Sequence, residues 1–250
     1  MFWRRSGKEE VPENSGRSIS VNGMEVPYRV ERRNVKFSRL EFTAGGLLAI
    51  IPKGCRDETP LLREKMGWIS EKYGAVQRIA ENAKAHNKNG NGLLVFGEFF
   101  GFRESESLKV DLDARTAEFN PCDKNHAKRL ERILKRELLA VLEPAVEEYS
   151  RKLGAEPRRI TVKRLRSRWG SCSSRGNLNF NLWLVCLPRE LVRYLACHEV
   201  AHLLEKNHRR AFWGLVGREF PNYREMERRL SEYWLFIQEY SCNTTKIFET

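Results

Sequence analysis

The sequence predicts an α+β fold, with a β-rich N-terminal portion and a later portion in which a histidine-rich helix lies beside a small sheet. Two observations favour this class. Short apolar stretches broken by Asn22-Gly23 and Gly45-Gly46 fill residues 19–54, as expected of strands and hairpins. Residues 188–204 instead begin with a proline and carry two histidines four residues apart, as expected of a helix face. A hydrophobic content of 41% in 250 residues is enough for a buried core.

A first long helix is predicted to begin at Thr59-Pro60, which fit a cap and a first helical turn. Its apolar positions step by four and three and define one buried stripe: Leu62, Met66, Ile69, Tyr73, Val76, Ala80 and Ala83. We expect this stripe to be core and not a partner surface. After the turn-rich residues 87–92, residues 93–102 and 108–119 alternate like strands.

A second long helix is predicted over residues 124–153, and Pro144 inside it should kink or split it, because the ring removes a hydrogen bond. Residues 160–165 and 178–185 are strand-like, and a final helix is expected over 223–240. We find no internal repeat in the sequence. The chain divides into a polar tail (1–18), a β-rich portion with one long helix (19–120), a portion with the histidine-rich helix (121–240) and a C-terminal tail (241–250).

Three of the five histidines fall within eleven residues, as His198-Glu199-Val200-Ala201-His202 followed by His208. On a helix, His198 and His202 lie one turn apart, about 6 Å between Cβ atoms, close enough to bind one zinc ion. Glu199 is not needed as a ligand, and its carboxylate can act as general base toward a water activated by the ion. The sequence therefore predicts one Zn²⁺ per chain and a catalytic Glu199. The alternative is a packed helix whose histidines are satisfied within the core.

The third ligand is predicted to be His208. Lys206-Asn207 precede it, and asparagine tolerates the left-handed conformation that ends a helix and turns the chain back. Three histidines would leave the fourth position open, as catalytic zinc requires. Glu205 is the rival, because it lies two turns after His198 on the same face and could ligate the ion or orient a ligand.

Several motifs resemble the YgjP-like metallopeptidase family in order and spacing. They are Arg168-Trp169-Gly170-Ser171-Cys172-Ser173, Gly176-Asn177-Leu178, Asn181, Leu187-Pro188, His198-Glu199-Val200-Ala201-His202-Leu203, Asn207-His208 and Phe212-Trp213. Together with features such as Val26-Pro27-Tyr28 and Trp68-Ile69, the resemblance covers about residues 19–240. Arg209 is a departure, because the family often has serine there.

The resemblance implies a zincin fold, related in architecture to SprT-like and WLM proteases. It implies His198, His202 and His208 as zinc ligands and Glu199 as the base for peptide hydrolysis. It also implies that a strand edge holds an extended polypeptide substrate, and we assign that edge to residues 178–185. Arg168, Tyr223 and Asn181 are our candidates for substrate binding. We expect Trp169, Phe212 and Trp213 to form a packed floor under the site.

The positive charge of the chain keeps two other functions open. Lys and Arg number 45 against 33 Asp and Glu, and fourteen basic residues against seven acidic ones lie between 123 and 170. The stretch 158–168 could attract a nucleotide or nucleic acid. One alternative is therefore a metal-dependent nucleotide pyrophosphatase or phosphohydrolase, and a second is a nucleic-acid-binding module with a structural metal. A solvated basic surface is the plain interpretation.

The sequence also predicts a cytoplasmic protein with no membrane association. No apolar run approaches the roughly 20 residues needed to cross a bilayer. The first residues lack the apolar core of a secretory signal. The six cysteines are scattered and include no Cys-x-x-Cys pair, so we expect reduced thiols.

Overall fold

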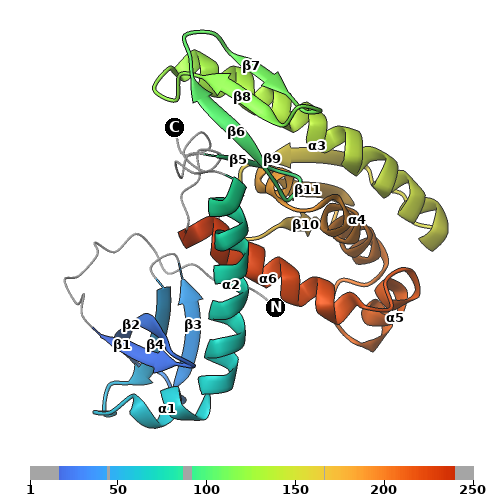
Figure 1. Cartoon of the computed structure of the whole chain (residues 1–250). Coiled ribbons are helices and arrows are strands. Elements are labelled where there is room, and N and C mark those ends of the chain that lie inside the picture. Colours follow the sequence, from blue (N-terminus) through green and yellow to red (C-terminus); the bar gives the residue numbers. More distant parts are fainter. Residues whose placement is uncertain (1–16, 44–45, 87–91, 166, 240–250) are drawn as a thin grey trace. The chain divides into compact units, whose positions relative to one another are not determined.

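The computed structural model describes residues 17–43, 46–86, 92–165 and 167–239, which form two compact units (Figure 1). Of the described residues, the larger unit contains those from 83 to 230, and the smaller unit contains those from 17 to 82 together with 231–239. The last helix, α6 (Tyr223–Glu239), begins in the larger unit and ends in the smaller one. None of the helices in the described ranges is long and apolar enough to span a membrane.

The smaller unit is built on a four-stranded sheet with the order β1-β2-β4-β3. Its strands are β1 (Ser18–Val21), β2 (Met24–Arg33), β3 (Arg39–Thr43) and β4 (Gly46–Pro52). β1 is antiparallel to β2, β2 is parallel to β4, and β3 is antiparallel to β4. The central strand β4 is buried from Leu47 to Ile51, which explains its continuous apolar sequence.

The helix predicted from Thr59 is two helices in the structure, α1 (Thr59–Glu64) and α2 (Met66–His86). Between them Lys65 has φ −98° and ψ 10°, outside the helical region. The buried stripe is confirmed at Leu62, Ile69 and Val76. A break of one residue leaves the stripe on the same side, so periodicity alone could not reveal it.

The larger unit contains a second four-stranded sheet, with the order β5-β6-β8-β7. Its strands are β5 (Leu93–Val95), β6 (Glu98–Glu104), β7 (Lys109–Asp111) and β8 (Thr116–Phe119). The pairings repeat those of the first sheet: β5 is antiparallel to β6, β6 is parallel to β8, and β7 is antiparallel to β8. A helix follows each sheet. The structure thus repeats a strand topology that the sequence does not reveal as a repeat.

Both sheets begin with the same two-residue turn. Asn22 and Gly23 have φ of 50° and 78°, and Phe96 and Gly97 have φ of 49° and 81°. Two successive positive φ values match a type I′ turn, which joins antiparallel strands without splaying them. The sequences share little besides the glycine, so the repeat lies in the topology and in the turn.

The long helix α3 (Lys124–Leu153) has the predicted bounds. The Asp123 side chain accepts a hydrogen bond from the Asn125 amide at its start, and Gly154 ends it with φ 69°. Pro144 does not split the helix. The helix packs against α4 (Arg189–Leu204), and its leucines at 130, 134, 138 and 142 are fully buried (Figure 1). Tertiary packing thus holds α3 together through the proline.

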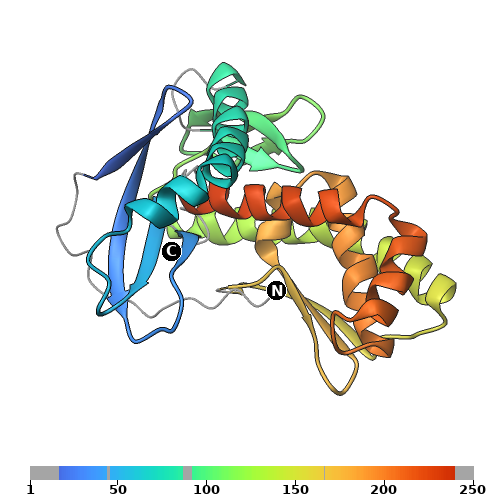
Figure 2. The same cartoon turned by 90° about the horizontal axis from the view of Figure 1, so that it is seen from below.

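A third sheet has the order β10-β11-β9, and its strand β10 lies against α4 (Figure 2). Its strands are β9 (Arg159–Lys163), β10 (Gly170–Cys172) and β11 (Asn177–Asn181). The strand predicted over 178–185 is wrong in its second half, because residues Leu182–Cys186 form a 3₁₀ helix, η1. β11 is also the central strand, so it offers no free edge.

We predict that Gly97→Ala destabilises the larger unit by about 3 kcal/mol. A Cβ on Gly97 would lie 2.7 Å from Cγ of Pro188, and φ is +81°. The turn is also pinned by hydrogen bonds from the Phe96 and Gly97 amides to the Val185 and Cys186 carbonyls, at 2.6 and 3.2 Å. Urea unfolding measures the loss.

Gly23→Ala is the matched control, because Gly23 occupies the same turn position with φ +78° and has nothing within 4 Å of an added Cβ. It should cost only the backbone strain, about 1 kcal/mol. Equal losses at the two glycines would contradict the contact with Pro188.

Candidate metal centre

Helix α4 brings His198, Glu199 and His202 into a protected position. Pro188 caps its start, and the other residues of its buried faces are Leu191, Val192, Tyr194, Leu195, Ala196, Cys197, Val200 and Ala201. The helix ends at Leu204, because Glu205 adopts extended angles of φ −121° and ψ 107°. The chain turns back there, earlier than the predicted end at Asn207, and α5 (Arg210–Glu219) follows.

The turn between α4 and α5 brings His208 to the two helical histidines. Its Nε2 lies 3.0 Å from Nε2 of His198 and 3.1 Å from Nε2 of His202. Ligand atoms of the three residues lie within 4.8 Å of one another. Two imidazole nitrogens on a tetrahedral zinc ion would lie about 3.3 Å apart, so the cluster fits a metal.

The rival ligand Glu205 enters the site through its backbone. Its carbonyl oxygen lies 2.9 Å from Nδ1 of His202. A carbonyl only accepts, so Nδ1 carries the proton and the Nε2 lone pair is free to bind a metal. Within the described residues, the histidine group that could hold an ion does not include the Glu205 side chain.

Burial keeps the imidazoles of His202 and His208 neutral. It lowers the pKa of His202 to about 4, and the pKa of His208 is also lowered to about 4, mainly by burial and by His198. Neutral imidazole is the form that binds a divalent cation. Near pH 7, therefore, proton release at His202 and His208 does not oppose metal binding.

A half-buried carboxylate lies behind His198. Glu227 of α6 accepts a hydrogen bond from the hydroxyl of Tyr194 at 2.6 Å, and its Oε1 lies 3.5 Å from Nδ1 of His198. Burial raises the pKa of Glu227, but the His198 ring and the Tyr194 hydroxyl outweigh burial and hold it below its usual value. Burial and Glu227 raise the pKa of Tyr194, so its hydroxyl stays a donor.

Glu199 is 4% exposed and lies next to the histidines. Burial raises its pKa to about 7, against the opposing effects of His198 and Arg168. Its Oε2 is buried and has no hydrogen-bond partner among the described residues. A divalent cation beside it would lower the pKa again. A carboxyl group that titrates near neutrality is suited to both taking and giving a proton.

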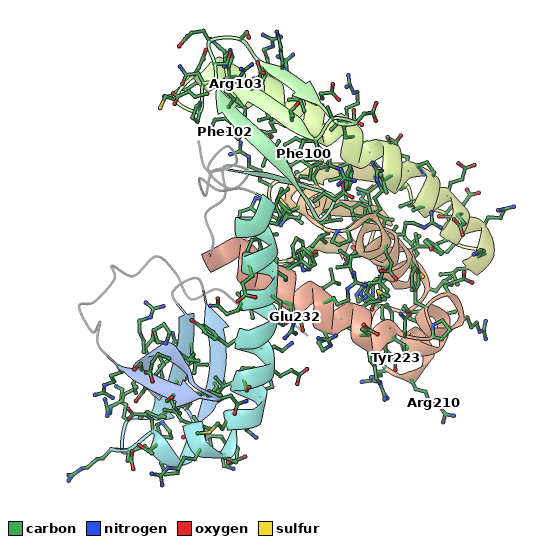
Figure 3. All side chains as sticks on the ribbon, in the orientation of Figure 1. Phe100, Phe102, Arg103, Arg210, Tyr223 and Glu232 are labelled. Atoms are coloured by element: carbon green, nitrogen blue, oxygen red, sulfur yellow. The ribbon has the colours of Figure 1, made fainter. Side chains whose placement is uncertain are left out.

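Two of the three aromatic residues predicted under the site, Phe212 and Trp213, lie against the histidines. Phe212 is fully buried and stacks on His202 at 4.5 Å between ring centroids. Trp213 lies 5.7 Å from His208 and stacks on Tyr223 at 4.7 Å. Tyr223 begins α6, at the place labelled in Figure 3. The predicted substrate residue Tyr223 is thus joined to the third histidine through one indole ring.

The other two predicted substrate residues differ from each other. Arg168 is exposed, and its charge acts on Glu199. Asn181 is fully buried. Its Nδ2 donates to the carbonyls of Leu165 and Arg168 at 2.9 Å, and its Oδ1 accepts from the amides of Leu165 and Trp183 at 3.3 Å. The Asn181 amide therefore holds the loop that presents Arg168.

Strand β10 forms the edge of its sheet next to α4. The Asn181 amide bonds to the Trp169 carbonyl, and the Ser173 amide bonds to the Asn177 carbonyl. Since antiparallel pairs alternate, Gly170 and Cys172 point their backbone groups away from β11. The free edge near the site is therefore β10.

The basic stretch lies largely at the other edge. Arg159 and Lys163 are on β9, with β11 between them and β10. Arg164 pairs with Glu131 at 2.6 Å. Arg166 lies outside the described residues.

Sequence reasoning missed Glu227 and Tyr194. Tyr194 stands four residues before His198, which was an available signal for one helix face. Glu227 is one of several charged residues on α6, and nothing in its spacing to the histidines marks it.

The three clustered histidines and the buried Glu199 fit a metallopeptidase. The chain belongs to the YgjP-like family: the model of the "YgjP-like, metallopeptidase domain" matches residues 36–233. No curated protein matches the chain. Among solved structures, it resembles the metallopeptidase zymogen abylysin of Pyrococcus abyssi, with 25% identity, 36% of this chain and 90% of that chain covered, and a TM-score of 0.34. It also resembles the zymogen jannalysin of Methanocaldococcus jannaschii, with 24% identity, coverage of 37% and 88%, and a TM-score of 0.33.

We predict that Asn181→Ala lowers the free energy of unfolding by about 3 kcal/mol, because the fully buried amide bonds the Leu165 amide and the Leu165 and Arg168 carbonyls, and all three bonds are lost. Asn181→Asp should also destabilise, since it keeps the acceptor but loses both donors. Chemical denaturation measures both. A raised KM at unchanged stability would instead support direct substrate binding by Asn181.

Proposed function

We propose that the protein is a zinc-dependent peptidase that holds one ion on His198, His202 and His208 and uses Glu199 as its general base. The observation that carries this proposal is the convergence of three Nε2 atoms, within 3.0–3.1 Å across His208, beside a buried carboxylate. A bound zinc ion would supply Lewis-acid activation of water and of the scissile carbonyl.

Glu199 moves the proton in this proposal. It takes one from the attacking water, keeps it in a water-poor position, and gives it to the leaving amine. Burial supports the second step, because it raises the pKa of the carboxyl group, whereas a bound cation would lower that pKa and support the first step. Arg168 and Tyr223 are the proposed contacts for the substrate.

The substrate we propose is an extended polypeptide paired with β10. Backbone groups of Gly170 and Cys172 point outward there, and main-chain pairing selects an extended chain with little regard to sequence. Strand β10 thus takes the place of residues 178–185 as the proposed docking strand. A cytoplasmic location is supported by the free thiols of Cys55, Cys122, Cys172, Cys186 and Cys197.

The nucleotide and nucleic-acid alternatives remain predictions. The basic residues on β9 lie at the sheet edge away from α4, and Arg164 is already paired with Glu131. These positions favour the peptidase as the first activity to assay.

The first test is metal content and hydrolysis of an unfolded protein. We expect about one zinc per wild-type chain, the same content in Glu199→Gln, and a loss of activity in Glu199→Gln of at least about 100-fold, because the general base is removed. His208→Ala should lose most of its metal. Mass spectrometry of the desalted proteins measures the metal.

His126→Gln is the control histidine. His126 is buried at the start of α3, where its Nδ1 accepts from the Asn120 amide at 3.0 Å, and it is not part of the cluster. Its metal content should equal that of wild type. A Glu199→Gln protein that is fully active would contradict the proposal, and phosphate release from a nucleoside triphosphate with no peptide cleavage would favour the phosphohydrolase.

We further predict that Glu227→Gln weakens zinc binding about 10-fold, because it removes the negative charge behind the His198 ring. Chelator competition measures the affinity. Glu225→Gln is the control on the same helix, since Glu225 is exposed and pairs with Arg228 at 3.7 Å. Equal zinc affinity in the two variants would show that Glu227 does not support the ligand.

A further inference from the structure

Gly170, the first residue of β10, lies directly against the side chain of Glu199. A Cβ atom built on Gly170 would lie 2.5 Å from Oε1 and 2.9 Å from both Cδ and Cγ of Glu199. Real Cβ atoms essentially never come within 3.0 Å of another atom. The end of the Glu199 side chain therefore packs against the backbone of residue 170, and it can do so only because that residue is glycine.

We propose that Gly170 is a positioning residue: the missing side chain forms the recess that fixes where the Glu199 carboxylate lies. The proposal rests on the proposed function of Glu199 as general base. It adds a residue that fixes the position of the Glu199 carboxylate and that lies 29 positions earlier in the chain, outside the histidine motif.

The backbone does not require glycine at this position. Positive φ values occur at Gly23, Gly97, Gly154 and Gly176, and Gly170 is not among them. In a strand, any L-residue can adopt the extended backbone. A glycine also stabilises a strand less than a residue whose side chain can pack. Space for Glu199 is thus the property that glycine supplies there.

The neighbour that must yield to a larger residue is the carboxylate itself. The three nearest atoms all belong to the flexible end of Glu199, and none belongs to the backbone. Ordinary contact begins at 3.4 Å, so a Cβ on residue 170 requires Oε1 at 2.5 Å to retreat by about 1 Å. The strand and helix can stay in place while the base moves.

A displacement of this size matters more to catalysis than to folding. Proton transfer needs heavy atoms within about 2.6–3.2 Å, and a misplacement of about 1 Å can lower a rate about 100-fold. The substitution should not push the histidines directly, because His198 and His202 lie on other faces of α4 and His208 lies beyond its end. Gly170→Ala should therefore separate base geometry from metal binding.

The test begins with Gly170→Ala in the full chain loaded with zinc. We expect kcat to fall about 100-fold, with KM within about twofold of wild type and zinc content unchanged. Loss of zinc, or a raised KM at unchanged kcat, would overturn the proposal, because the glycine would then serve the fold or the close approach of the substrate.

A thermal double-mutant cycle tests the contact without any activity. Gly170→Ala should lower Tm by about 4 °C when residue 199 is glutamate. In the Glu199→Ala background the recess is empty, so the same substitution should not lower Tm and can raise it slightly. Equal losses in both backgrounds would overturn the proposed contact.

Gly101→Ala is the matched control. Gly101 also lies in a strand of the larger unit, and an added Cβ would meet only ordinary contacts, at 3.8 Å from the Arg115 carbonyl and 4.0 Å from Thr116. It should leave kcat and zinc content unchanged. If Glu199→Gln proves fully active, the proposed function fails, while the thermal cycle still decides whether Gly170 sets the position of residue 199.

Discussion

The site depends on the burial of charge-bearing groups in an apolar helix. His198, Glu199 and His202 emerge from α4, whose other buried residues are almost all hydrophobic. Burying an isolated charge costs several kcal/mol, so groups in such a place either become neutral or share a counter-charge. Burial favours the neutral form of these groups: it lowers the pKa values of His202 and His208 and raises the pKa of Glu199. A divalent cation is the shared counter-charge.

The surrounding fold holds each polar group from outside the motif. A backbone carbonyl at Glu205 orients His202, Glu227 and Tyr194 lie behind His198, and β10 supports Glu199. These supports come from a loop, from α6 and from a strand. The short motif thus supplies the chemical groups, and residues far away in the chain set their directions.

Local patterns account for what could be predicted from the sequence. The bounds of α3 follow from its cap at Asp123 and its glycine at 154, and the closeness of His198 and His202 follows from their spacing on one helix. Long-range pairing accounts for what could not. The strand order that puts β11 in the centre joins residues 159–163 to 177–181, and no local pattern encodes that order. Similarly, a glycine in a strand gives no sign of which side chain rests on it.

The two sheets of equal topology differ in how their first turns are held. Phe96-Gly97 is tied to η1 and packed against Pro188, whereas nothing lies within 4 Å of a Cβ at Gly23, and both Asn22 and Gly23 are exposed. Chain insertions are tolerated at exposed turns that carry few contacts. The Asn22-Gly23 turn carries one hydrogen bond from Nδ2 of Asn22 to Oγ of Ser70, at 2.8 Å. A tag or a fluorescent label inserted after Gly23 should therefore disturb its sheet less than the same insertion after Gly97 disturbs the other sheet.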